Sequence, residues 1–268
     1  MALTNSDKNI EQTVDPVWKA MRQDAVEWAG EEVSLASWLH ASVLDHASLQ
    51  NALAFLLSSK LQANEIGSLS LYQVIYEAIK EDQEIIVSAR ADLSATYERD
   101  PACHSYLKPF IFYKGYQSIQ AHRVANWLWK QGRETLAQYI QSRVSEVFQV
   151  DIHPAAQIGK GIMMDHATGV VIGETAVLGD GVSLLHGVTL GGTGKEPGDR
   201  HPKIGSGTMI GAGASILGNI RVGECCRIGA GSVVLKDIPD NTSVAGIPAK
   251  ELGEAGVEQP AMSMEQNF

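Results

Sequence analysis

The sequence predicts two parts of different architecture, an all-α N-terminal domain followed by a β-helix. Of the 26 glycines, 4 lie in residues 1–150 and 22 lie after them. All tryptophans and tyrosines lie before residue 150, and no aromatic residue occurs between Phe148 and Phe268. Beyond residue 150, aliphatic residues followed by glycine recur with a period of six. A shift of this size indicates that two folds are joined near residue 148.

Residues 1–148 show apolar side chains at helical spacing. The first helix is expected to begin at Asp15-Pro16, which supplies an N-cap and a proline at the first helical position, and to end at Gly30. Ser68 is a candidate cap for a later helix, and Asp100-Pro101 is expected to break the pattern. The expected helices cover residues 16–30, 35–44, 49–61, 69–79, 85–93, 113–129 and 135–147.

The hexapeptide period assigns residues 149–250 to the β-helix. It runs through Leu178, Leu184 and Leu190, and again from Ile204 to Val234. Each repeat supplies one short strand and one turn, and glycine permits the backbone angles of the turn. The remaining segment, residues 251–268, is rich in Glu, Gln, Met and Ser and is expected to be a flexible tail.

The period fails at two places. Met164 to Ile172 spans eight residues, and Leu190 to Ile204 spans fourteen, so each break carries two residues more than a multiple of six. A solenoid can eject extra residues only outward, and outward loops commonly carry function.

The two breaks contain the candidate reactive residues. His166 in the first break could act as a general base if an acceptor, usually a carboxylate, orients its ring. Arg200 in the second break offers a planar fork for a carboxylate or phosphate. The glycine-rich stretch 191–195 could let backbone N–H groups approach a phosphate or a pantetheine chain, but its spacing is not that of a P-loop.

Composition excludes several classes of function. The net charge of −10 makes nucleic acid and anionic membranes poor partners. No apolar run is long enough to span a membrane, and the first residues lack the apolar core of a signal peptide, which predicts a cytoplasmic protein. Cys103, Cys225 and Cys226 form neither a disulfide framework nor a metal-binding pattern, so we expect reduced thiols.

The motifs at the breaks resemble bacterial serine O-acetyltransferases of the hexapeptide-repeat acyltransferase superfamily, and the match extends over nearly the whole chain. The residues that carry it are 165–169 (Asp-His-Ala-Thr-Gly), 199–202 (Asp-Arg-His-Pro), 246–249 (Gly-Ile-Pro-Ala), 100–102 (Asp-Pro-Ala) and 126–129 (Asn-Trp-Leu-Trp). The resemblance implies a left-handed parallel β-helix with an extruded loop. It also implies acetyl transfer from acetyl-CoA to the hydroxyl of L-serine, the first step of cysteine biosynthesis, with feedback inhibition by L-cysteine.

The resemblance assigns roles to nine residues. His166 is the expected base and Asp151 orients it, with no metal, no tightly bound cofactor and no cysteine nucleophile. Asp100 and Asp165 are expected to bind the serine ammonium group, and Arg200 and His201 the carboxylate or the developing charge. Main-chain contacts to acetyl-CoA are expected from Gly192, Ala212 and Ala230.

The resemblance also implies an assembly. Active sites of this fold lie between neighbouring subunits of a trimer, and the helical domain is expected to join two trimers into a hexamer. In the family, a C-terminal isoleucine inserts into cysteine synthase. This sequence ends at Phe268, which fits that role poorly, so binding of cysteine synthase is expected to be weak or absent.

Three other functions stay open at this stage. An acyltransferase acting on a sugar or another hydroxyl acceptor would use the same fold. A zinc hydratase on the same solenoid would need ligands from His153, His166, His186 and His201, which lack close metal-ligand spacing. A purely structural anchor for a partner enzyme would leave the residues at the breaks unexplained.

Overall fold

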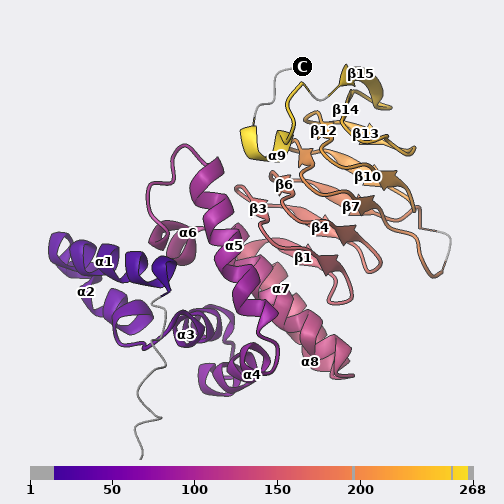
Figure 1. Ribbon diagram of the computed structural model, residues 1–268. Helices are drawn as coiled ribbons and strands as arrows, with labels where there is room; N and C mark the ends of the chain where they lie inside the picture. The colour runs from indigo at the N-terminus through magenta and orange to yellow at the C-terminus, as the bar shows by residue number, and fades with distance from the viewer. Residues whose placement is uncertain (1–14, 195–196, 255, 265–268) are drawn as a thin grey trace, which may run out of the picture.

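The computed structural model describes residues 15–194, 197–254 and 256–264. Expectations that rest on the first residues, on Lys195 or on Phe268 lie outside this part of the chain. Figure 1 shows the two parts side by side, with α5, α7 and α8 next to the β-helix and α1, α2 and α3 on the far side of them. The N-terminal helical elements are α1 (Pro16–Glu31), α2 (Val33–Leu39), the π-helical turn η1 (His40–Leu44), α3 (Leu49–Leu61), α4 (Ser68–Glu81), α5 (Glu84–Arg99), α6 (Leu107–Phe112), α7 (Lys114–Lys130) and α8 (Glu134–Phe148).

The helices expected from the sequence are present, with differences at their ends. Asp15 caps α1 by accepting hydrogen bonds from the backbone N–H groups of Val17 and Trp18, at 3.1 and 3.3 Å. Ser68 is not a cap but the first residue of α4, because Gly67 occupies the cap position. The sequence pattern missed α6, a six-residue helix that contains a proline, and ended α5 six residues early.

The β-helix consists of three sheets of parallel strands, and each of the first four coils gives one strand to each sheet; β15 adds an antiparallel strand to one of them. Within the described residues the chain completes five coils (Figure 1). Sheet A contains β1 (Val150–Ile152), β4 (Val170–Ile172), β7 (Thr189–Gly191), β10 (Ser215–Leu217) and β13 (Val233–Val234). Sheet B contains β2 (Gln157–Ile158), β5 (Val177–Leu178), β8 (Lys203–Ile204) and β11 (Arg221–Val222). Sheet C contains β3 (Met163–Met164), β6 (Ser183–Leu184), β9 (Met209–Ile210), β12 (Arg227–Ile228), β14 (Thr242–Ala245) and β15 (Lys250–Glu254).

The hexapeptide period sets the register of the coils. Leu178, Leu184 and Leu190 lie on successive sides of the solenoid, pair with Ile204, Ile210 and Ile216 on the next coil, and are all buried. The stacked aliphatic side chains fill the interior, which explains why the repeat contains no aromatic residue. The period alone predicted this arrangement, and the parallel pairings confirm it.

The C-terminal segment is attached to the rest of the protein in its described residues, unlike the free tail that its composition predicts. Strand β15 pairs antiparallel with β14. The short helix α9 (Pro260–Ser263) packs against α5 and β9, and both Pro260 and Ala261 are buried. The carbonyl of Ala261 accepts a hydrogen bond of 2.8 Å from the Ser183 hydroxyl.

A buried carboxylate joins the helical domain to the first coil. The side chain of Asp92 on α5 is fully buried and forms an ion pair of 2.7 Å with Arg123 on α7. It also accepts hydrogen bonds from the Gln120 amide at 2.9 Å and from the backbone N–H of Ile162 at 2.8 Å. Two helices and the β-helix therefore meet at one carboxyl group.

We predict that Asp92→Ala destabilises the protein by about 3–5 kcal/mol, because it leaves the buried Arg123 cation without its ion-pair partner. Urea unfolding would measure this loss. The matched control is Asp45→Ala, whose exposed carboxylate faces exposed His40 and should shift stability by no more than about 0.5 kcal/mol. If both substitutions lower the free energy of unfolding by the same small amount, Asp92 does not hold the helical domain to the β-helix.

Candidate active site

The first break in the repeat forms a tight turn that presents His166. The turn connects β3 in sheet C to β4 in sheet A, and both His166 and Ala167 adopt left-handed backbone angles, with φ of 57° and 60°. Non-glycine residues rarely adopt these angles, and such strain is often found at functional sites. The imidazole is 71% exposed, and its Nε2 atom lies 3.4 Å from Oδ2 of Asp165. The two extra residues thus push His166 out of the coil.

Asp165 and His166 line a hollow of about 470 Å³ together with Asp100 and Tyr113. Asp100 follows the end of α5, and its carboxylate is held by a hydrogen bond of 2.8 Å from the backbone N–H of Ala102. Burial raises the pKa of the Tyr113 phenol well above its usual value, and the nearby carboxylates of Asp100 and Asp165 raise it further. The hollow therefore combines two carboxylates, an imidazole and a neutral hydroxyl.

The start of α7 fixes the position of this turn. Gly115 lies so close to the backbone of Met164 that a Cβ atom there would overlap the Met164 carbonyl oxygen. Next to it, the Lys114 ammonium group contacts the Thr168 hydroxyl. The helical domain thus packs closely against β3, the strand that precedes Asp165 and His166.

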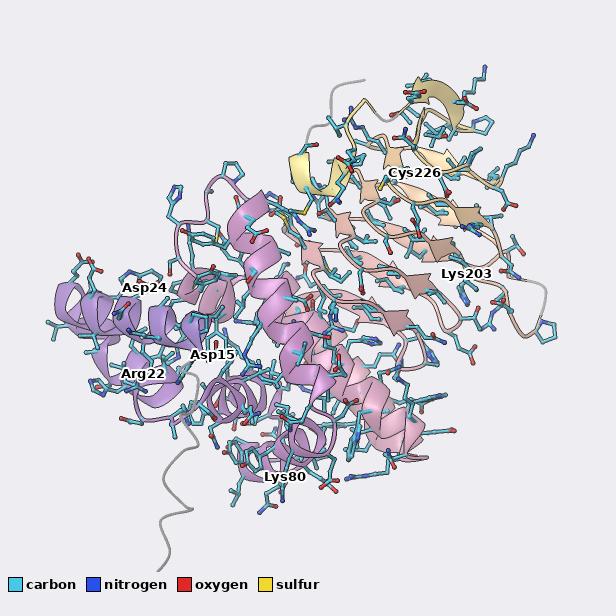
Figure 2. All side chains as sticks on the ribbon, viewed as in Figure 1. Asp15, Arg22, Asp24, Lys80, Lys203 and Cys226 are labelled. Carbon is cyan, nitrogen blue, oxygen red and sulfur yellow. The ribbon has the colours of Figure 1, made fainter. Side chains whose placement is uncertain are left out.

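The second break lies at a different corner of the β-helix, between sheets A and B. Arg200 forms an ion pair of 2.7 Å with Glu174, which lowers the pKa of that carboxyl. The Thr175 hydroxyl accepts hydrogen bonds from the backbone N–H groups of Arg200 and His201, at 3.0 and 3.1 Å. Figure 2 shows Lys203 at the edge of the β-helix, where the chain returns from this insertion.

His201 is held in one tautomer. The backbone N–H of Thr175 donates to Nδ1 of His201 at 3.2 Å, and the Thr175 hydroxyl lies 2.9 Å from the same nitrogen. Nδ1 is therefore the acceptor, and the proton of the neutral ring sits on Nε2. Burial lowers the pKa of His201, and the Arg200 cation lowers it further. Gly173 leaves room for the ring, since a Cβ there would overlap His201.

Asp151 is the middle residue of β1, and its side chain faces α8. It accepts a hydrogen bond of 2.7 Å from the Gln141 amide, and it lines a hollow with His153 and residues of α8. The carboxylate beside His166 within one chain is that of Asp165. The structure therefore does not bring Asp151 to His166 within a single chain.

The residues expected to contact acetyl-CoA also lie at two different corners of the β-helix. Ala212 and Ala230 lie in the turns between sheets C and A, on successive coils above His166 and His186. Backbone hydrogen bonds of 2.8 to 2.9 Å connect this column of turns, from Gly187 to Thr168, from Gly213 to His186 and from Gly231 to Ala212. Gly192 lies at the other corner, against the Arg200 side chain.

One chain therefore carries two separate groups of expected site residues, here called the first and second half-sites, near opposite ends of the sheet A strands. The first half-site is Asp100, Asp165 and His166, with Ala212 and Ala230 above them. The second half-site is Arg200, His201 and Gly192, and Asp151 lies on β1 between the two. A three-residue strand spans roughly 10 Å, so the strands of sheet A keep the half-sites apart.

Sequence reasoning missed Tyr113, Glu174 and Thr175. Glu174 and Thr175 follow Ile172-Gly173, so their place directly after a repeat unit was a signal that could have been used. Nothing in the local sequence connects Tyr113 to Asp100. In the described residues, no group of three or more His, Cys, Asp or Glu side chains is arranged to hold a metal ion. None of the helices in this part of the chain is long and apolar enough to cross a membrane.

Comparison with protein-family models gives two matches. Residues 17–121 match "Serine acetyltransferase, N-terminal", and residues 201–236 match "Bacterial transferase hexapeptide (six repeats)". A serine acetyltransferase from Salmonella typhimurium is 50% identical over 96% of this chain and 94% of its own. Serine acetyltransferase 4 from Arabidopsis thaliana is 53% identical over 94% of this chain and 71% of its own.

Three solved structures of similar proteins contain small molecules. A serine acetyltransferase in complex with cysteine has a TM-score of 0.92 and 49% identity, covering 94% of this chain and 98% of its own. The Brucella abortus enzyme in complex with coenzyme A has a TM-score of 0.90 and 49% identity, with 91% and 98% covered. The Neisseria gonorrhoeae enzyme in complex with serine has a TM-score of 0.86 and 52% identity, with 90% and 99% covered.

We predict that Gly115→Ala destabilises the protein by about 1–3 kcal/mol, since the new methyl group must displace the backbone of Met164. Urea unfolding measures the loss, and the NMR signals of the His166 ring would report movement of the adjacent turn. Gly30→Ala is the control, because this helical glycine has no atom within 4 Å of an added Cβ and should gain stability or stay unchanged. An unperturbed Gly115→Ala protein would show that the close approach does not fix the turn.

Proposed function

The chain belongs to the serine acetyltransferase family, and from this premise we propose that it transfers the acetyl group of acetyl-CoA to the hydroxyl of L-serine. The products are O-acetyl-L-serine and CoA, and the reaction is the first step of cysteine biosynthesis, carried out in the cytoplasm. The observation that carries the proposal is the convergence of Asp100, Asp165 and His166 on one hollow. The direct test is thiol release from acetyl-CoA, which should depend on L-serine.

His166 is the proposed general base. Its imidazole removes the proton from the serine hydroxyl as the oxygen attacks the thioester carbonyl. The tetrahedral intermediate collapses by breaking the carbon–sulfur bond, and the imidazolium returns the proton to the departing CoA thiolate. The strained turn holds the ring in solvent-accessible space, where a substrate hydroxyl can reach it.

Two groups of opposite charge account for selection of an amino acid. Asp100 and Asp165 supply the negative charge that an ammonium group requires, and both line the hollow beside His166. Arg200 supplies the positive charge for the carboxylate. The Nε2–H of His201 is a second donor, available because Thr175 fixes the tautomer. A sugar acceptor has no ammonium group and leaves the paired carboxylates without a partner, which favours serine over a sugar.

The complete site forms between two subunits of a trimer. The two half-sites occupy different corners of the β-helix, so a threefold arrangement places the first corner of one subunit against the second corner of its neighbour. In this arrangement Arg200 and His201 reach the serine bound near His166, and Asp151 of the neighbouring subunit orients the ring. Contacts between helical domains would then join two trimers into a hexamer.

Acetyl-CoA binds in the same proposed interface between the two corners. Above His166 and His186, whose rings lie 5.8 Å apart, the column of turns offers the small side chains of Ala212 and Ala230 and backbone groups along the helix axis. Gly192 approaches from the second corner. The pantetheine chain can follow this track and place its thioester beside His166, and no metal or tightly bound cofactor is needed.

L-cysteine is the proposed inhibitor. It has the ammonium and carboxylate groups of serine, with a thiol in place of the hydroxyl. It can therefore occupy the serine position through Asp100, Asp165 and Arg200. The expectation about cysteine synthase concerns Phe268, which lies outside the described residues.

We predict that His166→Ala lowers turnover by about 10²–10⁴-fold while acetyl-CoA affinity stays within a few fold, because the imidazole acts on the serine proton. Asp151→Asn should give a milder loss, since it changes only the orientation of the ring. Steady-state kinetics and CoA binding would measure both effects. Exposed His40 provides the control substitution, His40→Ala, and near-normal turnover of His166→Ala at neutral pH would refute the assignment of the base.

We further predict that inactive subunits complement each other. When His166→Ala and Arg200→Ala chains are co-expressed in equal amounts, about a quarter of the interfaces combine an intact first corner with an intact second corner. Activity should return to about that fraction of the unmodified enzyme. If each site were contained in one chain, no mixture of the two variants would be active.

A further inference from the structure

Arg99 is a buried cation that the proposed mechanism does not use. It is the last residue of α5 and is only 7% exposed. Its Nη1 donates to the carbonyl of Gly181 at 3.2 Å and to the hydroxyl of Ser183 at 3.0 Å. Its Nε lies 3.0 Å from the sulfur of Met262 on α9. Among the described residues, no carboxylate forms an ion pair with it.

Burying a cation among neutral acceptors is costly, so this arrangement needs an explanation beyond stability. Burial lowers the pKa of the Arg99 guanidinium, which agrees with this cost. The joint between the domains is already held by Asp92, two helical turns earlier on the same helix. A second anchor at the end of α5 also fixes the position of the residue that follows it in the chain.

That residue is Asp100. Its backbone N–H ends α5 by donating to Thr96, and its carboxylate reaches the hollow that contains Asp165 and His166. Arg99 fastens this helix end to the second coil of the β-helix, at β6 and the turn before it. The first coil ends in Asp165 and His166. The anchor therefore sets the position of Asp100, on the helical domain, relative to Asp165 and His166, on the β-helix.

We propose that Arg99 is a positioning residue for serine binding, which holds the Asp100 carboxylate at the distance from Asp165 that an ammonium group requires. The proposal rests on the proposed function, because it takes Asp100 as the ligand of the serine ammonium group. The helix α9 also lines the space that holds the Arg99 guanidinium. Met262 contacts the guanidinium, and the Ser183 hydroxyl accepts from Arg99 and donates to the carbonyl of Ala261.

The test compares Arg99→Met, Arg99→Lys and a control on the same helix. Arg99→Met should raise the serine KM by about tenfold or more, while the acetyl-CoA KM changes less than about twofold, because only the ammonium subsite is displaced. Arg99→Lys keeps the charge but loses the planar fork, so it should rescue part of the loss. The control is Arg90→Met, whose side chain pairs with Asp15 at 2.6 Å, away from the hollow.

A double-mutant cycle with Asp100→Asn separates positioning from general loss of structure. If Arg99 acts through Asp100, Arg99→Met should add little to the serine KM of the Asp100→Asn enzyme. Full additivity, or equal rises in the KM of both substrates, would overturn the inference. An unchanged serine KM in Asp100→Asn alone would instead show that the proposed role of Asp100 is wrong. If Asp100→Asn raises the serine KM but Arg99→Met leaves it unchanged, only the inference about Arg99 is wrong.

Discussion

The close packing of the helical domain on the first coil is the constraint on which the rest of the structure depends. A single carboxylate, that of Asp92, receives hydrogen bonds from α7 and from the backbone of the first coil. Beside it, Gly115 brings the start of α7 against the strand before His166. Without this contact the hollow has no second wall, because Asp100 and Tyr113 come from the helical domain while Asp165 and His166 come from the β-helix.

The β-helix explains why the expected site residues of one chain fall into two groups. A solenoid of stacked coils places equivalent turns in columns, so residues from different coils line up along one corner. Residues at different corners stay apart, whatever their sequence distance. His166 and Ala230 share a corner although 64 positions separate them, whereas His166 and His201 do not. In the proposed trimer, the threefold axis brings the two corners together.

The two half-sites differ in their charged and hydrogen-bonding groups. At the first, two carboxylates lie beside an exposed imidazole, an arrangement suited to a cation and to proton transfer. At the second, Glu174 holds Arg200 and Thr175 fixes the tautomer of a neutral His201. The second half-site therefore offers donors in fixed directions, which suits a carboxylate or a developing oxyanion.

The sequence by itself determined the architecture, because the hexapeptide period and the helical spacing are local patterns that packing must satisfy. It also singled out His166, Arg200 and His201 as candidate site residues, since a break in a repeat is visible without any structure. Only the tertiary structure placed Asp100 beside Asp165, gave Arg200 and His201 their partners Glu174 and Thr175, and separated Asp151 from His166 within one chain. These relations depend on how helices pack on coils and on which corner a turn occupies. The same reason applies to α9, whose buried residues contact side chains far away in the sequence that no local pattern identifies.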